Sequence, residues 1–343
     1  MELTEEHALL EGAVRDFVAT QVAPHAAAWD HEGALPARLW KALAGLGLTG
    51  VRAPDSLGGA GMDALALGLV VETVARASGS VAWLLAVHGA IALAAALALE
   101  DHETAGQLAR GERIGAFAIL PDVRAQRTGD LWHLRGRAES VTFDPARGLL
   151  VAVAATGEGP TAFRLDPGAV KLHRTATLGL AAAPIGHLDI DGPGQLLGTP
   201  GHAMTLIETL QAGANPVFAA LSVGLAQGAL DTALAYASER RQFGKPIADF
   251  QAIQWMIADA ATELEAARLL TRKAATGGDR ADGLAARILA AEAAVSAADR
   301  ALQIHGGYGY TRDYPVERFW RDAQRLLVGV DAARAELGKL TCA

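Results

Sequence analysis

Apolar residues are spaced in two different ways along the chain, and this spacing divides it into three zones. In residues 1–114 they recur every three or four positions, which is typical of helices that pack on one side. Thr4, with two glutamates directly after it, is placed to cap a first helix that runs to about Val22. Further helices are expected over residues 37–46, 63–78 and 80–99.

The middle zone, residues 115–200, has the pattern of strands. An unbroken apolar run at 149–155 is followed by a turn and by Thr161–Leu165, which suits a second strand. Helices return in residues 201–343, where apolar positions at steps of three and four predict an antiparallel helical bundle. The most regular of these series is Leu284, Ile288, Ala291, Val295, Ala298 and Leu302. The predicted fold class is therefore α+β, with three domains at 1–114, 115–200 and 201–343.

Composition narrows the class of protein without changing these elements. With 343 residues, 51% of them hydrophobic and 20% charged, the chain is globular and long enough for two or three packed units. The net charge of −8 argues against a nucleic-acid partner, which would require a basic face. The only cysteine, Cys342, allows no internal disulfide, and the N-terminus lacks a signal-peptide pattern, so a cytoplasmic protein is expected. No metal site is predicted.

One stretch is apolar enough to be weighed as a membrane span. Val81–Leu99 has the length, but it is mostly alanine, and His88 and Gly89 interrupt it. A buried helix is the better interpretation, and no membrane span is expected. His88, on this apolar helix, is interpreted as a hydrogen-bonded structural residue.

Three segments in the last third of the chain carry the most specific patterns. Residues 239–246 read Glu-Arg-Arg-Gln-Phe-Gly-Lys-Pro, and residues 303–310 read Gln-Ile-His-Gly-Gly-Tyr-Gly-Tyr. Residues 314–323 read Tyr-Pro-Val-Glu-Arg-Phe-Trp-Arg-Asp-Ala. Together with the order of the zones, these segments resemble the flavin-dependent acyl-CoA dehydrogenase family over nearly the whole chain. The resemblance implies an N-terminal helical domain, a small middle β-barrel or sheet domain, and a C-terminal four-helix bundle.

The resemblance also implies FAD as the cofactor, an acyl-CoA substrate and electron-transfer flavoprotein as a partner. In the family, FAD lies across a subunit interface, and its ADP half reaches the neighbouring subunit. An arginine fork suits a pyrophosphate because its fixed N–H donors meet several anionic oxygens. The residues that match the family's contacts on this side are Arg240, Gln242, Phe243, Gln303, Gly306 and Gly307.

Each of these matches has a simpler interpretation when taken alone. Arg240 and Arg241 would then be a solvated helix end, and the glycine pair a helix C-cap. His305, beside that pair, is interpreted as a structural residue. The charges at 317–322 are also interpreted as structural, at an inter-subunit seam. The joint occurrence of the two motifs at the family's spacing favours the cofactor interpretation.

The chain departs from the family where the chemistry would take place. The reaction requires a carboxylate that removes the α-proton. The family's glutamate aligns with Val330, and the base position that some relatives use instead aligns with Ala214. Asp331 is one residue late and would point about a third of a turn away. Asn215 stands where the family has an arginine.

Contacts to the flavin ring are missing as well. The apolar segment at 116–121 is followed by a shortened stretch without the family's Gly-Ser-Asp loop. The family's Trp-Ile-Thr triplet reads Ser140-Val141-Thr142 here, which leaves Thr142 as a single hydroxyl. The missing residues are those that would contact the flavin ring and the acyl group. The residues that remain are those that would reach the FAD of a neighbouring subunit.

This division leads to the hypothesis of a non-catalytic subunit in a heteromeric α2β2 acyl-CoA dehydrogenase. The partner would be a second acyl-CoA dehydrogenase subunit, as in actinobacterial relatives that act on steroid side chains; a fatty acyl substrate is equally open. Two alternatives remain. One is a self-sufficient flavoenzyme, a homo-oligomer, that uses Asp331 as base or a different redox chemistry. The other is a structural or regulatory protein without a cofactor.

Overall fold

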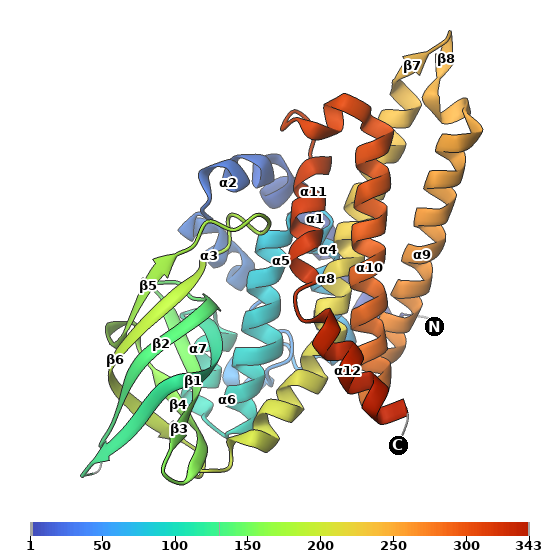
Figure 1. The fold of residues 1–343 in the computed structure, drawn as a ribbon. Helices are drawn as coiled ribbons and strands as arrows, with labels where there is room; N and C mark the ends of the chain where they lie inside the picture. The colour runs from blue at the N-terminus through green and yellow to red at the C-terminus, as the bar shows by residue number, and fades with distance from the viewer. Residues whose placement is uncertain (1–2, 130, 342–343) are drawn as a thin grey trace.

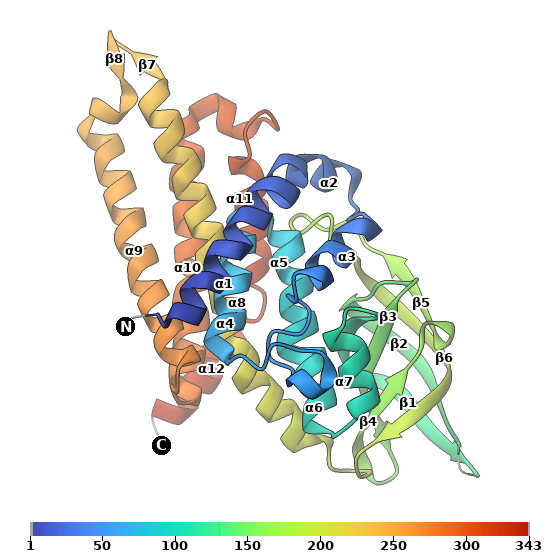
Figure 2. The same ribbon diagram turned by 180° about the vertical axis from the view of Figure 1, so that it is seen from behind.

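The structure, a computed structural model, describes residues 3–129 and 131–341. Helices at the N-terminus, a β-barrel and a bundle of long helices lie side by side (Figure 1). Helix α5 runs between the barrel and the bundle in both views (Figure 2). This arrangement is the predicted order of helices, strands and helices. Cys342 lies outside the described residues.

Seven helices form the N-terminal part, and their bounds follow the apolar spacing closely. They are α1 (Glu5–Phe17), α2 (Ala26–Glu32), α3 (Ala37–Gly45), α4 (Ala64–Ala75), α5 (Gly79–Ala86), α6 (Ala94–Ala98) and α7 (His102–Ala109). The side chain of Thr4 accepts a hydrogen bond from the His7 amide, as expected of a cap. Two π-helical turns, Val18–Val22 and Val87–Leu93, extend α1 and α5. The helical runs therefore end near the predicted positions. Helices α2 and α7 were not predicted.

The middle zone is a sheet that closes on itself. Its strands are β1 (Ile114–Thr128), β2 (Leu131–Thr142), β3 (Gly148–Thr156), β4 (Gly159–Leu165), β5 (Val170–Arg174) and β6 (Ile185–Leu197). They follow the order β2-β1-β3-β4-β6-β5, and β2 also pairs with β6, which completes a barrel. The apolar run predicted at 149–155 is β3, which is buried because its two faces pack against different cores. Strand β6 alternates between buried and exposed positions, with Leu188 and Ile190 inside the barrel core.

The C-terminal part consists of long antiparallel helices. They are α8 (Ala203–Glu239), α9 (Gln251–Ala275), α10 (Arg280–His305), α11 (Val316–Leu326) and α12 (Val330–Thr341). A small hairpin, β7 (Arg241–Gln242) and β8 (Lys245–Pro246), joins α8 to α9 at one tip of the bundle (Figure 1). The sequence predicts a helix around Val217–Ser238 here, but α8 begins at Ala203 and contains Pro216. The helix accommodates this proline because the residues around it are buried in the core.

Two helical runs have the length and hydropathy of membrane spans, at Gly79–Ala98 and Ala203–Glu239. The apolar windows in them are 72% and 78% buried inside the fold, so both serve as core helices. One continuous apolar core joins the N-terminal helices to the bundle, and a second fills the barrel. The helix-packing prediction for Val81–Leu99 therefore agrees with the structure.

The charged residues of α11 are structural, as predicted, and their ion pairs in the described residues lie within this chain. Arg321 forms an ion pair with Asp30 of α2 at 2.6 Å, within the same chain. Asp322 is buried, and its carboxylate accepts a hydrogen bond from the Leu180 amide. These groups hold α11 against the N-terminal helices and the segment before β6, because their hydrogen-bond partners lie there.

Candidate functional site

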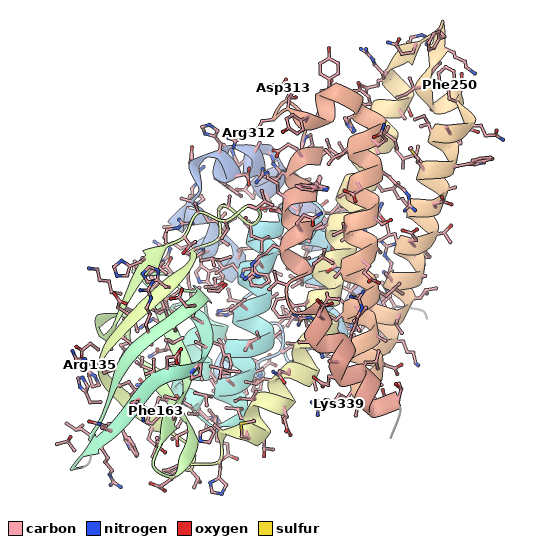
Figure 3. All side chains as sticks on the ribbon, in the orientation of Figure 1. Arg135, Phe163, Phe250, Arg312, Asp313 and Lys339 are labelled. Carbon is pink, nitrogen blue, oxygen red and sulfur yellow. The ribbon has the colours of Figure 1, made fainter. Side chains whose placement is uncertain are left out.

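A cavity of about 720 Å³ lies at the end of the bundle that carries the β7–β8 hairpin. It is called the bundle-end cavity below. Its wall comes from the end of α8, the hairpin, the start of α9 and the end of α10. Phe250, Arg312 and Asp313 mark this end of the molecule (Figure 3). Five of the six predicted cofactor residues line the cavity: Arg240, Gln242, Phe243, Gly306 and Gly307.

Arg240 is the cation of this cavity. It follows directly after α8, where the backbone leaves the helix, and its guanidinium lies 5.6 Å from the centre of the Tyr308 ring. In the part of the chain that the structure describes, no carboxylate forms an ion pair with it. Its N–H donors are therefore free to bind an anion such as a pyrophosphate.

The remaining residues of the cavity are aromatic rings and backbone. Phe243 has a side chain that is 94% exposed and a φ of +51°, and its ring contacts Phe250 edge-on at 6.2 Å. Gly306 has a φ of +58°, which favours glycine, and an added Cβ would meet no atom within 4 Å. The backbone at this point is therefore open to the cavity.

Gln303 and His305 also lie near this end of the bundle, and they differ in position and contacts. Gln303 is exposed on the last turn of α10 and does not line the cavity. His305 lines it, but its Nδ1 is 2.8 Å from the Ala301 carbonyl oxygen and its ring stacks on Tyr236. Burial lowers the pKa of His305, which keeps the ring neutral. This arrangement agrees with a structural role for the histidine.

A second cavity, of about 360 Å³, lies between the barrel and the bundle and is called the interdomain cavity. It is bounded by α5, β1, β2, α8 and α10. Ala214, one of the two base positions, lines it, and Val330, the other, is buried close by at the start of α12. Neither carries an acid. Asp331 points to solvent, with a side chain that is 97% exposed and paired with Arg334 at 3.1 Å.

The flavin-ring contacts that the sequence lacks are replaced by other structure. Strand β1 pairs with β3 up to Leu120, shifts register, and continues beside β2 from Arg124, so the chain has no extended loop there. The hydroxyl oxygen of Thr142 accepts a hydrogen bond from the Trp83 indole at 2.8 Å. Trp83 also packs on Phe218 at 5.2 Å and occupies part of the cavity.

Sequence reasoning did not single out Trp83 or Arg287, although both line the interdomain cavity. A signal for Arg287 existed. It lies three residues after Leu284 and four before Ala291, so it interrupts the apolar series of α10 on its buried side. The sequence pointed less clearly to Trp83, because a tryptophan in an apolar helix is usually a core residue.

Comparison with known proteins assigns the family. The models of the N-terminal and C-terminal domains of acyl-CoA dehydrogenases match residues 4–103 and 206–329. The probable acyl-CoA dehydrogenase FadE25 of Mycobacterium tuberculosis is 34% identical, with 94% of this chain and 91% of that protein covered. The chain therefore belongs to the acyl-CoA dehydrogenase family.

Solved structures agree with this assignment. A glutaryl-CoA dehydrogenase in complex with glutaryl-CoA is 32% identical, with a TM-score of 0.94 and coverage of 98% of this chain and 95% of that one. Butyryl-CoA dehydrogenase of Megasphaera elsdenii is 27% identical, with a TM-score of 0.95 and complete coverage of both chains. These matches confirm the predicted fold, and the family confirms FAD as the cofactor class.

The two cavities differ in how well they fit the two halves of FAD. The bundle-end cavity offers an unpaired guanidinium and the rings of Phe243, Phe250 and Tyr308, which suit a pyrophosphate and an adenine. The interdomain cavity is smaller, and Trp83 holds the one hydroxyl that the sequence left for the flavin ring. The bundle-end cavity thus has groups that suit the ADP half, whereas the Thr142 hydroxyl in the interdomain cavity is already bonded to Trp83.

Proposed function

We propose that this chain is the non-catalytic subunit of a heteromeric, FAD-dependent acyl-CoA dehydrogenase. The assembly would dehydrogenate an acyl-CoA thioester between its α- and β-carbons, with FAD taking the hydride from the β-carbon. A partner subunit would supply the carboxylate that removes the α-proton and the contacts to the flavin ring. This chain would hold the ADP half of the partner's FAD in the bundle-end cavity.

The contrast between the two cavities carries this proposal. The bundle-end cavity keeps Arg240, Gln242, Phe243 and the glycine pair together. The interdomain cavity has alanine and serine where relatives need an acid and an aromatic ring. General loss of function would not spare one half of the site. An exposed Phe243 at the tip of the hairpin also suits a residue that contacts a neighbouring subunit.

The roles of the individual residues follow from their positions. Arg240 would bind the pyrophosphate through its N–H fork, and Phe243 would cover the adenine side. The open backbone at Gly306 and Gly307 would allow the cofactor to approach closely. Gln303 would reach the adenine from the exposed face of α10, outside the cavity wall. Each role belongs to this chain, and none includes a proton transfer.

A second candidate is a self-sufficient dehydrogenase in a homo-oligomer, because the relatives of this chain are named as acyl-CoA dehydrogenases in their own right. Asp331 would then be the base. Its side chain is in solvent and paired with Arg334, which does not favour this role. Asp331→Asn separates the two candidates: it abolishes activity in a self-sufficient enzyme and leaves a heteromer unchanged. A cofactor-free structural protein would be colourless in every preparation.

The direct test is to express the chain alone and together with an acyl-CoA dehydrogenase from an adjacent open reading frame. The partner should carry both the Glu-Gly-Thr and the Gly-Ser-Asp motifs that this chain lacks. We expect the chain alone to purify without flavin absorbance. The pair should copurify with FAD, and an acyl-CoA should bleach the flavin. A chain that purifies alone with stoichiometric FAD and reduces it with an acyl-CoA contradicts the proposal.

Two further features complete the proposal. Electrons would leave the reduced flavin through an electron-transfer flavoprotein, and the assembly would act in the cytoplasm. Both can be checked on the same preparation: reduction of a purified electron-transfer flavoprotein should depend on the partner's glutamate, and cell fractionation should place both subunits in the soluble fraction.

A further inference from the structure

The interdomain cavity contains a cation without a counter-ion. Arg287 projects into the cavity from α10, and among residues 3–129 and 131–341 no carboxylate pairs with its guanidinium. Burial lowers the pKa of Arg287 below its ordinary value, and no neighbouring acid offsets this effect. A partly buried guanidinium without a carboxylate partner favours the binding of an anion.

The contacts of Arg287 leave most of its donors unused. Its Nη1 donates to Asn215 Oδ1 at 3.3 Å, a long bond to a neutral acceptor. Its guanidinium lies 5.2 Å from the centre of the Phe218 ring. A guanidinium carries five N–H donors, so the planar fork that binds carboxylates remains available. Asn215 stands where the family has an arginine, so the positive charge in this cavity comes from α10 and not from α8.

The backbone adds to the positive potential at this point. A Cβ placed on Gly329 would lie 3.6 Å from Nη2 of Arg287, and α12 begins at the next residue. The N-terminal end of a helix carries a partial positive charge. The position that aligns with the family's glutamate, Val330, supplies no carboxylate to balance it. The Arg287 guanidinium and the N-terminal end of α12 therefore lie next to each other.

The charges at the opposite rim do not neutralise Arg287. Glu139 lines the cavity, but its carboxylate is paired with Arg137 at 2.7 Å. Arg325 lies over the Trp83 ring at 5.4 Å and donates to the Ser140 hydroxyl at 3.1 Å. The rim thus adds a second cation, and its one acid already has a partner.

The rest of the cavity is apolar. Trp83, Val87, Ile91, Ile207 and Phe218 supply its walls. These side chains would exclude a fully hydrated ion such as inorganic phosphate, and they would favour a ligand with a hydrocarbon body. The volume of about 360 Å³ suits a small organic molecule.

We propose that the interdomain cavity binds a small organic carboxylate, with the carboxylate at Arg287 and the hydrocarbon body against Trp83 and Phe218. In this chain the cavity would then be a ligand site without chemistry, since it has no base. The inference does not depend on the proposed function, because a carboxylate can bind here whether or not the chain contacts a partner's FAD.

The test compares two probes of the same length, hexanoate and hexanamide, by isothermal titration of the purified protein, with its partner subunit where the two copurify. We expect hexanoate to bind at least about tenfold more tightly than hexanamide, because only hexanoate makes a charge-assisted bond to Arg287. Arg287→Gln should lower hexanoate affinity by about tenfold or more and leave hexanamide unchanged. Arg287→Lys should give an intermediate value, since it keeps the charge and loses the fork.

Arg280→Gln is the matched control. Arg280 lies on the same helix but is paired with Glu336 on the surface, so hexanoate affinity should stay within about twofold. The comparison of probes on the unmodified protein needs no variant, so a misfolded Arg287 variant does not block the test. Equal binding of hexanoate and hexanamide, no binding of either, or full hexanoate affinity in a folded Arg287→Gln protein would each overturn the proposal.

Discussion

Arg240 is an exposed cation that contributes little to the stability of the chain itself. It has an aromatic neighbour, Tyr308, but no carboxylate partner in the described residues. We expect Arg240→Ala to change the free energy of unfolding by less than about 0.5 kcal/mol. It should weaken FAD binding by the assembly at least about tenfold, because a charge-assisted fork to the pyrophosphate is lost. Flavin absorbance after gel filtration at low protein concentration measures this loss.

The neighbouring arginine provides the control. Arg241 donates to the Gly244 carbonyl within the hairpin and does not line the bundle-end cavity. Arg241→Ala should therefore leave FAD retention unchanged. If both variants lose FAD equally, the effect is one of general charge at this end of the molecule, and the specific role of Arg240 is refuted.

His88 is a structural histidine whose position predicts an acid-dependent stability. It is fully buried; its Nε2 is 3.1 Å from the Thr49 carbonyl oxygen, and its Nδ1 accepts the Gly115 amide at 2.9 Å. Burial lowers the pKa of His88 to about 4. The ring is thus neutral, with the proton on Nε2, and it ties α5 and its extension to the loop at Thr49 and to the start of β1.

The sign of the pH effect follows from this lowered pKa. Between about pH 6.5 and pH 4 the unfolded chain binds a proton at His88 that the folded chain does not. The contribution of this group to stability is complete above about pH 6.5, declines as the pH falls from 6.5 to about 4, and is lost below that, by roughly 3 kcal/mol in total. Urea unfolding across this range should show a steeper loss in the unmodified protein than in His88→Gln. Parallel curves for the two proteins would contradict the assignment.

The residues that line the bundle-end cavity could be predicted from sequence motifs, but Trp83 and Arg287 of the interdomain cavity could not. Arg240, Gln242, Phe243 and the glycine pair come from two segments with family-specific spacing, and the structure brings them together. Trp83 and Arg287 carry no motif, and what they do depends on contacts between α5, α8, α10 and β2. Such contacts are set by packing between elements that are distant in sequence, which periodicity cannot show.

Two of the glycines in helix α8, Gly213 and Gly224, lie in opposite environments. A Cβ on Gly224 would lie 2.2 Å from the Glu72 carbonyl oxygen, because α8 crosses α4 closely at this point. A Cβ on Gly213 would meet no atom within 4 Å, and this residue is exposed. The two positions lie in the same helix and differ mainly in what packs against them.

Gly224→Ala should therefore destabilise the protein by about 1–3 kcal/mol, since backbone atoms of α4 must move. Gly213→Ala should stabilise it by roughly 0.5–1 kcal/mol, because alanine loses less entropy in a helix. Thermal or urea unfolding of the two variants measures both. If both substitutions shift stability in the same direction, the close crossing of α4 and α8 is not the determining factor.

Sequence periodicity predicted the type of nearly every long element, and its errors are local. Helix α8 begins before the predicted Val217, because burial of the surrounding residues holds the helix together across Pro216. Strand β1 is longer than its apolar run because it changes partner from β3 to β2 after Leu120. Both errors arise where tertiary pairing outweighs the local preference of the residues.

The three parts of the molecule are joined by charges on α11 as well as by apolar packing. Arg321 pairs with Asp30 and Glu317 at 2.6 Å each, and its side chain is only 14% exposed. It also donates to the Leu178 carbonyl at 3.1 Å, in the segment that leads into β6. These acids and hydrogen bonds raise the pKa of Arg321 against the opposing effect of burial. One side chain thus contacts the N-terminal helices, the barrel connection and the bundle.

Arg321→Met should cost about 3–5 kcal/mol of the free energy of unfolding, because it leaves Asp30 and Glu317 as unpaired acids with little solvent. Adding Asp30→Asn should recover part of this cost, with a coupling energy above about 1 kcal/mol in a double-mutant cycle. Limited proteolysis should also cut the Arg321→Met protein faster around α2. The exposed Arg334, paired with Asp331 and Glu292, is the control, and Arg334→Met should cost less than about 1 kcal/mol. If the two arginine variants were equally stable, α11 would be held by its apolar face alone, and the ion pairs would contribute nothing to how the three parts stay together.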